Sequence, residues 1–204
     1  MPSRSSEGPL ERLPNLLVTG TPGTGKSTVA SRLRKAFEEV GAHEESPFYI
    51  NVTDLVKNNS SEFAVGFDQV RDCFIIDEDV VLDYLEPLMQ SGKVLLEHHS
   101  SEWFPERWFS RVVVLRCTTN ELYQRLEARG YTPAKVQENV QAEIMNICVD
   151  EALESYDHGI VSVFENNSAR DLEEIVRDLR AWWQVRNVFG DMRQPAVRWD
   201  STGT

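Results

Sequence analysis

The sequence predicts an α/β fold in which a five-stranded, mostly parallel β-sheet carries helices on both faces. Strand-like apolar runs alternate with helix-like segments along the chain, a pattern typical of this class. A chain of 204 residues fits one domain that buries most of its apolar surface. Its 41% hydrophobic and 26% charged residues are ordinary for a folded, soluble protein.

The expected elements follow in chain order. Residues 1–12 are polar and without periodicity, which predicts a flexible N-terminal arm before a domain at 13–189. Short apolar runs predict strands at 16–19, 48–51, 94–97, 112–116 and 160–164. Apolar residues at helical spacing predict helices at 26–40, 79–90, 120–129, 133–156 and 169–188. Residues 190–204 mix Gly, Pro and polar residues and predict a flexible tail, in which Trp199 is the large aromatic residue.

Two helix starts have clear signals. Thr132 is a good N-cap, and Pro133 suits the first helical turn that follows it. Asp77 precedes the predicted helix at 79–90, where a carboxylate can cap free N–H groups and interact with the positive end of the helix dipole.

Charge, cysteine content and hydropathy limit the classes of binding partner, the state of the thiols and the compartment that we expect. A formal net charge of −12 repels nucleic-acid and membrane phosphates, so direct nucleic-acid binding is disfavoured and a basic protein is the better partner. Cys73, Cys117 and Cys148 have no metal-ligand spacing, which predicts reduced packing residues. No apolar run approaches the ~20 residues of a membrane span, and the first residues lack a secretory signal, so a cytosolic or nuclear protein is expected.

The stretch GTPGTGKST at residues 20–28 carries the most specific signal. Gly20, Gly25, Lys26 and Ser27 fit the pattern G-x-x-x-x-G-K-[ST], with a predicted strand before it and a helix after it. Backbone N–H groups of such a loop surround a phosphate, the lysine reaches the β- and γ-phosphates, and the serine hydroxyl ligates Mg²⁺. The predicted ligand is therefore a nucleoside triphosphate with Mg²⁺. No N/T-K-x-D segment occurs, which disfavours a GTPase, and the length fits a small kinase.

Phosphoryl transfer needs fixed positive charge around the transferred group. Arg116, Arg125 and Arg129 are the candidates, and the last two share one face of a predicted helix. The alternative is a solvated helix surface in which Arg125 and Arg129 pair with Glu121 and Glu127.

Two carboxylates compete for the place beside Mg²⁺. Asp77 is more simply a helix cap, whereas Glu97 ends a better strand and is preferred. His98 and His99 follow Glu97 at the carboxyl edge of the sheet, where α/β ligand sites form. Each is either a surface residue or a group that positions the attacking hydroxyl or water.

The motifs PNLLVTGTPGTGKST, INVTDL, DED, FPERW, VVVLR, LYQRLEARGY, NVQAEI and EALESY, in this order, resemble the adenylate kinase isoenzyme 6 family, also called the coilin-interacting nuclear ATPases. The match spans about residues 13–183. It implies the nucleoside monophosphate kinase fold, with a monophosphate-binding segment at about 51–77 and a short lid at about 128–138.

The resemblance also implies a function. It implies AMP kinase and ATPase activities, a role in late maturation of the small (40S) ribosomal subunit and its 18S rRNA, and a platform ribosomal protein of the pre-40S particle as partner. It further implies residence in nucleus and cytoplasm. The residues implied to bind ATP are Gly20, Gly23, Thr24, Gly25, Lys26, Ser27, Thr28 and Arg129, and those implied to bind AMP are Asn51, Thr53, Asp54 and Lys57.

Two positions depart from the family pattern. Glu97-His98-His99 stands where the family has Asp-x-His, so the carboxylate is one methylene longer while the His99 position is kept. Lys57 stands where many kinases of this fold have arginine, so the bidentate fork is lost and weak AMP use is expected. Two further hypotheses stay open at this point: an ATP-switched assembly chaperone, and a small-metabolite kinase of the shikimate or gluconate type.

Overall fold

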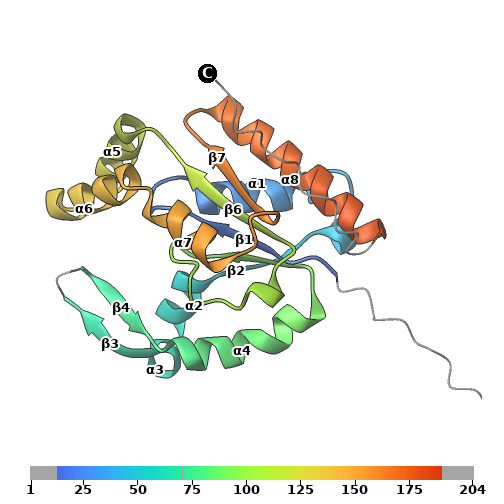
Figure 1. Cartoon of the computed structure of the whole chain (residues 1–204), viewed down its shortest axis with the longest axis horizontal. Helices are drawn as coiled ribbons and strands as arrows, with labels where there is room; N and C mark the ends of the chain where they lie inside the picture. The colour runs from blue at the N-terminus through green and yellow to red at the C-terminus, as the bar shows by residue number, and fades with distance from the viewer. Residues whose placement is uncertain (1–12, 70, 190–204) are drawn as a thin grey trace, which may run out of the picture.

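The computed structural model describes residues 13–69 and 71–189; the predicted arm at 1–12 and tail at 190–204, with Trp199, lie outside them. Its main sheet has five parallel strands in the order β2-β5-β1-β6-β7 (Figure 1). The strands are β1 (Leu16–Thr19), β2 (Phe48–Asn51), β5 (Val94–Glu97), β6 (Arg111–Arg116) and β7 (Val161–Glu165). The five predicted strands are confirmed to within one residue at each end.

Both faces of the sheet are covered because successive strand residues point to opposite sides. Leu16 and Val18 pack with α1 (Lys26–Glu38) and α8 (Ala169–Phe189) in one core cluster that includes the fully buried Trp183. Leu17 packs in the cluster on the other face, which includes residues of α4 (Glu78–Ser91) and α7 (Ile147–Ser155). The predicted α/β architecture is therefore confirmed.

A third, smaller cluster joins two helices at the carboxyl edge of the sheet. Leu122 and Leu126 of α5 (Thr119–Ala128) pack with Cys117 and with Val136 of α6 (Pro133–Ile144). Thr132 caps α6 by accepting a hydrogen bond from the Lys135 N–H, as the sequence predicted.

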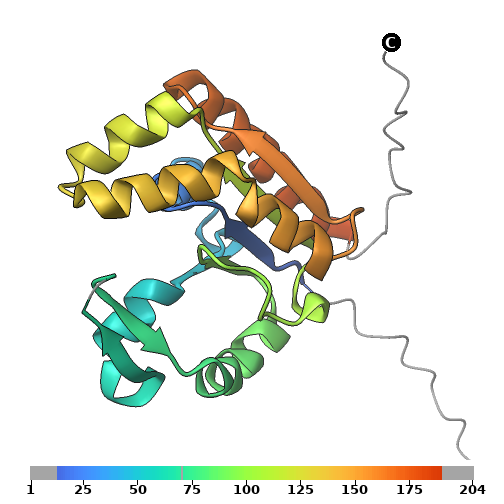
Figure 2. The same cartoon turned by 60° about the vertical axis from the view of Figure 1, so that its left-hand side comes forward.

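The single helix predicted at 133–156 is wrong, because the chain forms α6 and α7 with a break between them. Asn146 lies at the break with φ 57°, a left-handed conformation that asparagine tolerates better than most residues. The break redirects the chain, so that Ala152 of α7 is buried against the sheet while α6 extends away from it (Figure 2).

The segment after β2 contains elements that the sequence patterns did not predict. It forms α2 (Val52–Asn58), α3 (Ser60–Phe63) and an antiparallel hairpin of β3 (Ala64–Asp68) and β4 (Cys73–Ile76). The hairpin and the α5–α6 pair project from the same side of the molecule (Figures 1 and 2). Their tips are in contact, since Arg71 pairs with Glu138 at 3.2 Å and Lys135 Nζ donates to the Arg71 carbonyl oxygen at 2.8 Å.

Two short 3₁₀ helices, His43–Glu45 and Glu106–Trp108, complete the fold. Within the residues that the structure describes, no helix combines the length and apolar character that a membrane span requires.

Candidate active site

The glycine-rich loop connects β1 to the first turn of α1. Gly20 and Gly25 have φ of 134° and 100°, values that favour glycine. A Cβ at Gly20 would lie 2.2 Å from the Leu115 carbonyl oxygen, and one at Gly25 would lie 2.4 Å from Asn166 Nδ2. Asn166 Nδ2 also donates to the Thr24 carbonyl oxygen at 2.8 Å. Sterics and this hydrogen bond therefore fix the curvature of the loop.

The start of α1 is suited to an anion. Its N-cap, Gly25, provides no side-chain hydrogen bond, and its first turn contains no acidic residue. By contrast, Asp77 caps α4 by accepting a hydrogen bond from the Val80 N–H, as predicted. The first-turn N–H groups of α1 and the positive end of its dipole are thus directed at the loop without a protein anion, which is the arrangement that binds phosphate.

Lys26 is buried beneath this loop. Its Nζ donates to the carbonyl oxygens of Gly20 at 2.6 Å and Thr21 at 3.2 Å. Burial lowers the pKa of Lys26 to about 8, although the charge of Glu97 acts in the opposite direction. Within the described residues Lys26 forms no ion pair. Its ammonium group is held by neutral carbonyls and can exchange them for phosphate oxygens.

Ser27 and Glu97 meet at the base of the loop. The Ser27 hydroxyl donates to Glu97 Oε1 at 2.7 Å, and the Tyr49 hydroxyl donates to Glu97 Oε2. The carboxylate is buried, because Glu97 is only 4% exposed. Among residues 13–69 and 71–189 no three His, Cys, Asp or Glu side chains gather to hold a metal. A hydroxyl with one carboxylate behind it does fit Mg²⁺, which keeps waters and takes phosphate oxygens as its other ligands.

Beside the loop lies a cavity of about 440 Å³. Arg125 and Arg129 both line it, so the structure brings the two predicted arginines to one site. Arg125 Nε also donates to Glu121 at 3.0 Å, which is the surface pairing that the sequence left open, whereas Arg129 forms no ion pair within the described residues. The remaining lining residues are Gly23, Gly25, Thr28, Ala128, Asn166, Ser168, Ala169 and Leu172.

Comparisons with known proteins identify the family of the chain. The chain is 40% identical to the adenylate kinase isoenzyme 6 homolog FAP7 of Saccharomyces cerevisiae over 83% of this chain and 81% of that one. It is 39% identical to the homolog of Caenorhabditis elegans over 80% of this chain and 85% of that one. The chain belongs to the adenylate kinase isoenzyme 6 family. It is therefore a member of the adenylate-kinase-like, ATP-dependent kinases.

A family model and two solved structures complete the comparisons. The AAA domain family matches residues 16–146. A solved shikimate kinase from Acinetobacter baumannii superposes with a TM-score of 0.55 at 13% identity, covering 86% of this chain and 96% of that one. A gluconokinase from Sinorhizobium meliloti gives 0.51 at 17% identity, covering 87% and 95%. The likenesses to these two solved kinases show the fold alone.

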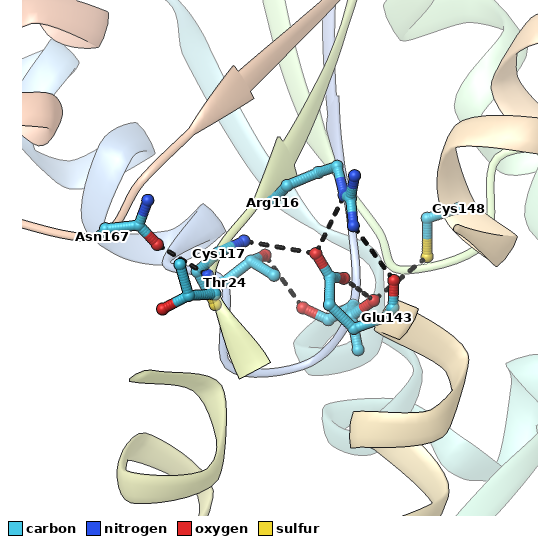
Figure 3. A network of polar contacts seen from close by, with 8 residues as sticks. Thr24, Arg116, Cys117, Glu143, Cys148 and Asn167 are labelled. Atoms are coloured by element: carbon cyan, nitrogen blue, oxygen red, sulfur yellow. Dashed lines mark hydrogen bonds and ion pairs between the residues drawn. The ribbon is translucent and has the colours of Figure 1, made fainter. Parts of the chain in front are cut away.

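In this family member a second buried carboxylate holds the start of the loop. Glu143 of α6 accepts hydrogen bonds from the Thr21 hydroxyl, from Arg116 Nε at 3.1 Å and from the Cys117 N–H at 3.2 Å (Figure 3). Arg116 Nη2 also donates to the Glu143 carbonyl oxygen. Arg116, which the sequence offered as a charge for phosphoryl transfer, is therefore paired with Glu143. Its guanidinium is satisfied by the end of α6.

Of the two histidines after Glu97, His98 is buried, which its loop position did not predict, and His99 is exposed. His98 stacks edge-on against Trp103 and Phe104, and its Nδ1 contacts the Ser100 carbonyl oxygen at 2.9 Å. Burial lowers the pKa of His98 to about 3, and desolvation together with the charge of Lys26 lowers that of His99 to about 4. Both imidazoles are thus neutral at neutral pH, and a neutral imidazole can accept a proton or a hydrogen bond.

The predicted AMP-binding residues lie at the start of α2, on the β2 side of Glu97. Asn51 caps α2 by accepting a hydrogen bond from the Asp54 N–H at 3.0 Å. Thr53, Asp54 and Lys57 are exposed. Asn51 and Glu97 are register partners in the β2–β5 pair, which places this segment beside the phosphate loop.

Three residues of the site were missed by sequence reasoning: Tyr49, Glu143 and Asn166. Asn166 directly follows β7, so its position at the carboxyl edge of a parallel sheet was a usable signal. Tyr49 shares a strand face with Asn51, two residues on. No sequence signal marked Glu143, because it lies in the middle of the segment that was predicted as one long helix at 133–156.

Proposed function

We propose that this chain is a Mg²⁺-dependent enzyme that transfers the γ-phosphoryl group of ATP to AMP and also hydrolyses ATP. The observation that carries the proposal is the Ser27–Glu97 hydrogen bond beside buried Lys26, at an uncapped helix start. The names of the curated relatives, which include a putative adenylate kinase of Methanococcus maripaludis at 31% identity, support the choice of acceptor.

Each residue has a defined task in this proposal. Ser27 would ligate Mg²⁺, with Glu97 holding the serine hydroxyl in place. When bound, Mg²⁺ offsets the negative charge of the phosphate oxygens. Lys26 binds the β- and γ-phosphates, and Arg129, with Arg125, stabilises the transferred charge from the cavity side. His99, with Glu97, positions water for the hydrolytic reaction.

AMP would bind at the start of α2. Asn51, Thr53 and Asp54 contact the nucleotide there, and Lys57 supplies a charge to its phosphate. A lysine ammonium is a point charge without the bidentate fork of arginine, so AMP is held loosely. We therefore expect slow transfer to AMP.

In the cell, we place this activity in late 40S subunit maturation, including 18S rRNA processing, through a basic platform ribosomal protein of the pre-40S particle. The family resemblance supports this role, and so does the net charge of −12, which favours a basic protein over direct contact with nucleic acid. The proposed residence is nucleus and cytoplasm.

A second candidate is an ATP-switched assembly chaperone with incidental kinase activity. The observation that favours it is the Thr21–Glu143 hydrogen bond, which ties the phosphate loop to α6. A change in the loop on nucleotide binding would reach that projecting helix and any protein bound to it.

Product analysis separates the two candidates. Purified protein is incubated with Mg·ATP, with and without AMP, and ADP is counted against free phosphate. Each transfer to AMP yields two ADP and no phosphate, so the enzyme hypothesis predicts that ADP exceeds phosphate when AMP is present. Equal amounts of phosphate and ADP, unchanged by AMP, would favour the chaperone.

The test of the site and its matched control are two lysine substitutions in α1. Lys26→Ala removes the buried phosphate-directed ammonium and is expected to abolish both reactions. Lys35→Ala removes a lysine whose side chain is 60% exposed and pairs with Glu39 at 3.8 Å, so it should leave both reactions intact. Activity that survives Lys26→Ala would contradict the proposed site.

A further inference from the structure

The carboxylate of Glu97 is held by two neutral hydroxyls. Ser27 donates to one oxygen at 2.7 Å and Tyr49 donates to the other. Within the described residues no ion pair includes Glu97. The carboxylate is therefore oriented without a direct ion pair to a protein cation, and its orientation depends on both hydroxyls.

The position of Tyr49 follows from the sheet. Strands β2 and β5 are parallel neighbours in which Tyr49 faces Leu95 and Asn51 faces Glu97. The tyrosine is thus two register positions short of Glu97, and its long side chain spans that offset. A glutamate has three rotatable side-chain bonds, so one hydrogen bond to Ser27 would leave its second oxygen unrestrained.

A second contact extends this set toward the monophosphate side. Asn51 Oδ1 accepts from the Asp54 N–H at 3.0 Å, so its Nδ2 is the atom that faces Tyr49 and donates to the phenol oxygen at 3.4 Å. Because the phenol oxygen accepts from Asn51, its own hydrogen is directed at Glu97. Hydrogen bonds thus run without interruption from Ser27 through Glu97 and Tyr49 to the cap of α2.

We propose that Tyr49 is a positioning residue that fixes Glu97, and through it the metal-directed Ser27 hydroxyl, relative to the start of α2. This inference rests on the proposed function, because it concerns how the Mg²⁺ side and the AMP side of one site are held in a fixed relative position. Tyr49 itself touches neither nucleotide. Its hydroxyl acts through the carboxylate on one side and through Asn51 on the other.

The first test is Tyr49→Phe, which deletes one hydroxyl and keeps the ring. ADP affinity is measured by calorimetry with a Mg²⁺ series and with EDTA. We expect the Mg²⁺ concentration for half-maximal effect to rise about five- to tenfold, and the affinity in EDTA to change less than twofold. The control is Tyr123→Phe, which deletes the hydroxyl of an exposed tyrosine bonded to Glu127, and it should leave both values unchanged. Unchanged Mg²⁺ dependence in Tyr49→Phe would overturn the proposal.

The second test is a double-mutant cycle with Glu97→Asp, which withdraws the carboxylate by one methylene. If Tyr49 acts through Glu97, Tyr49→Phe should shift the urea unfolding midpoint less in the Glu97→Asp background than in the wild type. Equal shifts in both backgrounds would mean that the hydroxyl acts independently of Glu97 and would overturn the proposal.

The double-mutant cycle is measured without nucleotide, so its result does not depend on whether the proposed kinase and ATPase function is correct. If the wild type shows no Mg²⁺-dependent ADP binding while the midpoint shifts are non-additive, the proposed function fails and the Tyr49–Glu97 coupling stands. If Mg²⁺-dependent binding is present and the shifts are additive, the function stands and the role of Tyr49 fails.

Discussion

Two buried glutamates hold opposite ends of the phosphate loop, and their partners differ in kind. Glu97 and Glu143 are each 4% exposed. Glu97 accepts from the hydroxyls of Ser27 and Tyr49, whereas Glu143 accepts from the Thr21 hydroxyl and forms an ion pair with Arg116. Neutral donors orient a carboxylate and leave its charge to act on a ligand. A guanidinium neutralises the carboxylate, so we expect Glu143 to stabilise the fold and Glu97 to serve the proposed chemistry.

The largest expected effect is the loss of stability in Glu143→Gln. The substitution leaves the Arg116 guanidinium, whose side chain is 27% exposed, without its counter-charge. Removing one member of a buried pair costs about 3 kcal/mol, the lower end of the usual range because Arg116 is partly hydrated. Urea unfolding measures the free energy of unfolding.

The matched control for that prediction is Glu138→Gln on the same helix. Glu138 pairs with Arg71 at 3.2 Å, but both side chains are more than half exposed, and exposed pairs contribute less than about 1 kcal/mol. Similar losses in Glu138→Gln and Glu143→Gln would show that burial does not distinguish the two ion pairs, and the comparison would fail.

The next effect is the loss of activity in Glu97→Gln. The amide retains an oxygen that can accept from Ser27 but removes the negative charge behind the proposed metal site. We expect kcat for ADP formation from Mg·ATP and AMP to fall about 100-fold, a size typical for loss of one electrostatic contact in an active site. The free energy of unfolding should change by less than about 1 kcal/mol. A loss of stability with unchanged kcat would mean that Glu97, like Glu143, stabilises the fold and does not serve chemistry.

Acid pH provides a third contrast, because histidines adjoin Glu97 while Glu143 pairs with an arginine that stays charged. Burial lowers the pKa of His98 to about 3, against 6.5 in an unfolded chain. Between pH 6.5 and 3 the unfolded chain binds a proton that the folded protein does not, so stability falls as the pH falls. His98→Gln should reduce that slope by about 1.4 kcal/mol per pH unit. Urea unfolding at pH 6.5, 5.5 and 4.5 measures it, and an unchanged slope would contradict the lowered pKa.

The sequence predicted the parts of the fold that repeat a simple pattern. Buried parallel strands are short apolar runs, so β1, β5 and β6 were clear from residue type alone. The β3–β4 hairpin has an irregular register and mostly exposed or half-buried residues, so it lacks that pattern. The break at Asn146 was hidden because apolar residues continue at helical spacing on both sides of it.

For the site, local motifs were predictable and tertiary pairings were not. The loop from Gly20 to Ser27 is contiguous, so its residues could be named from one stretch of sequence. The partner of Arg116 lies 27 residues later on another element, and no periodicity links the two. An arginine near a phosphate loop therefore gave no indication of whether its charge was available to a ligand.

The same distinction between paired and available charge predicts the smallest effect, within the cavity. Arg125 and Arg129 both line it, but Arg125 donates to Glu121 at 3.0 Å while Arg129 forms no ion pair within the described residues. Arg129→Ala should therefore lower kcat/KM for ATP about tenfold, whereas Arg125→Ala should lower it less than about threefold, because part of its charge is already offset. Steady-state kinetics at saturating AMP compares the two variants. If Arg125→Ala were the more damaging, the Glu121 pair would have to open on nucleotide binding, and the paired state of an arginine would not indicate whether its charge is available to the ligand.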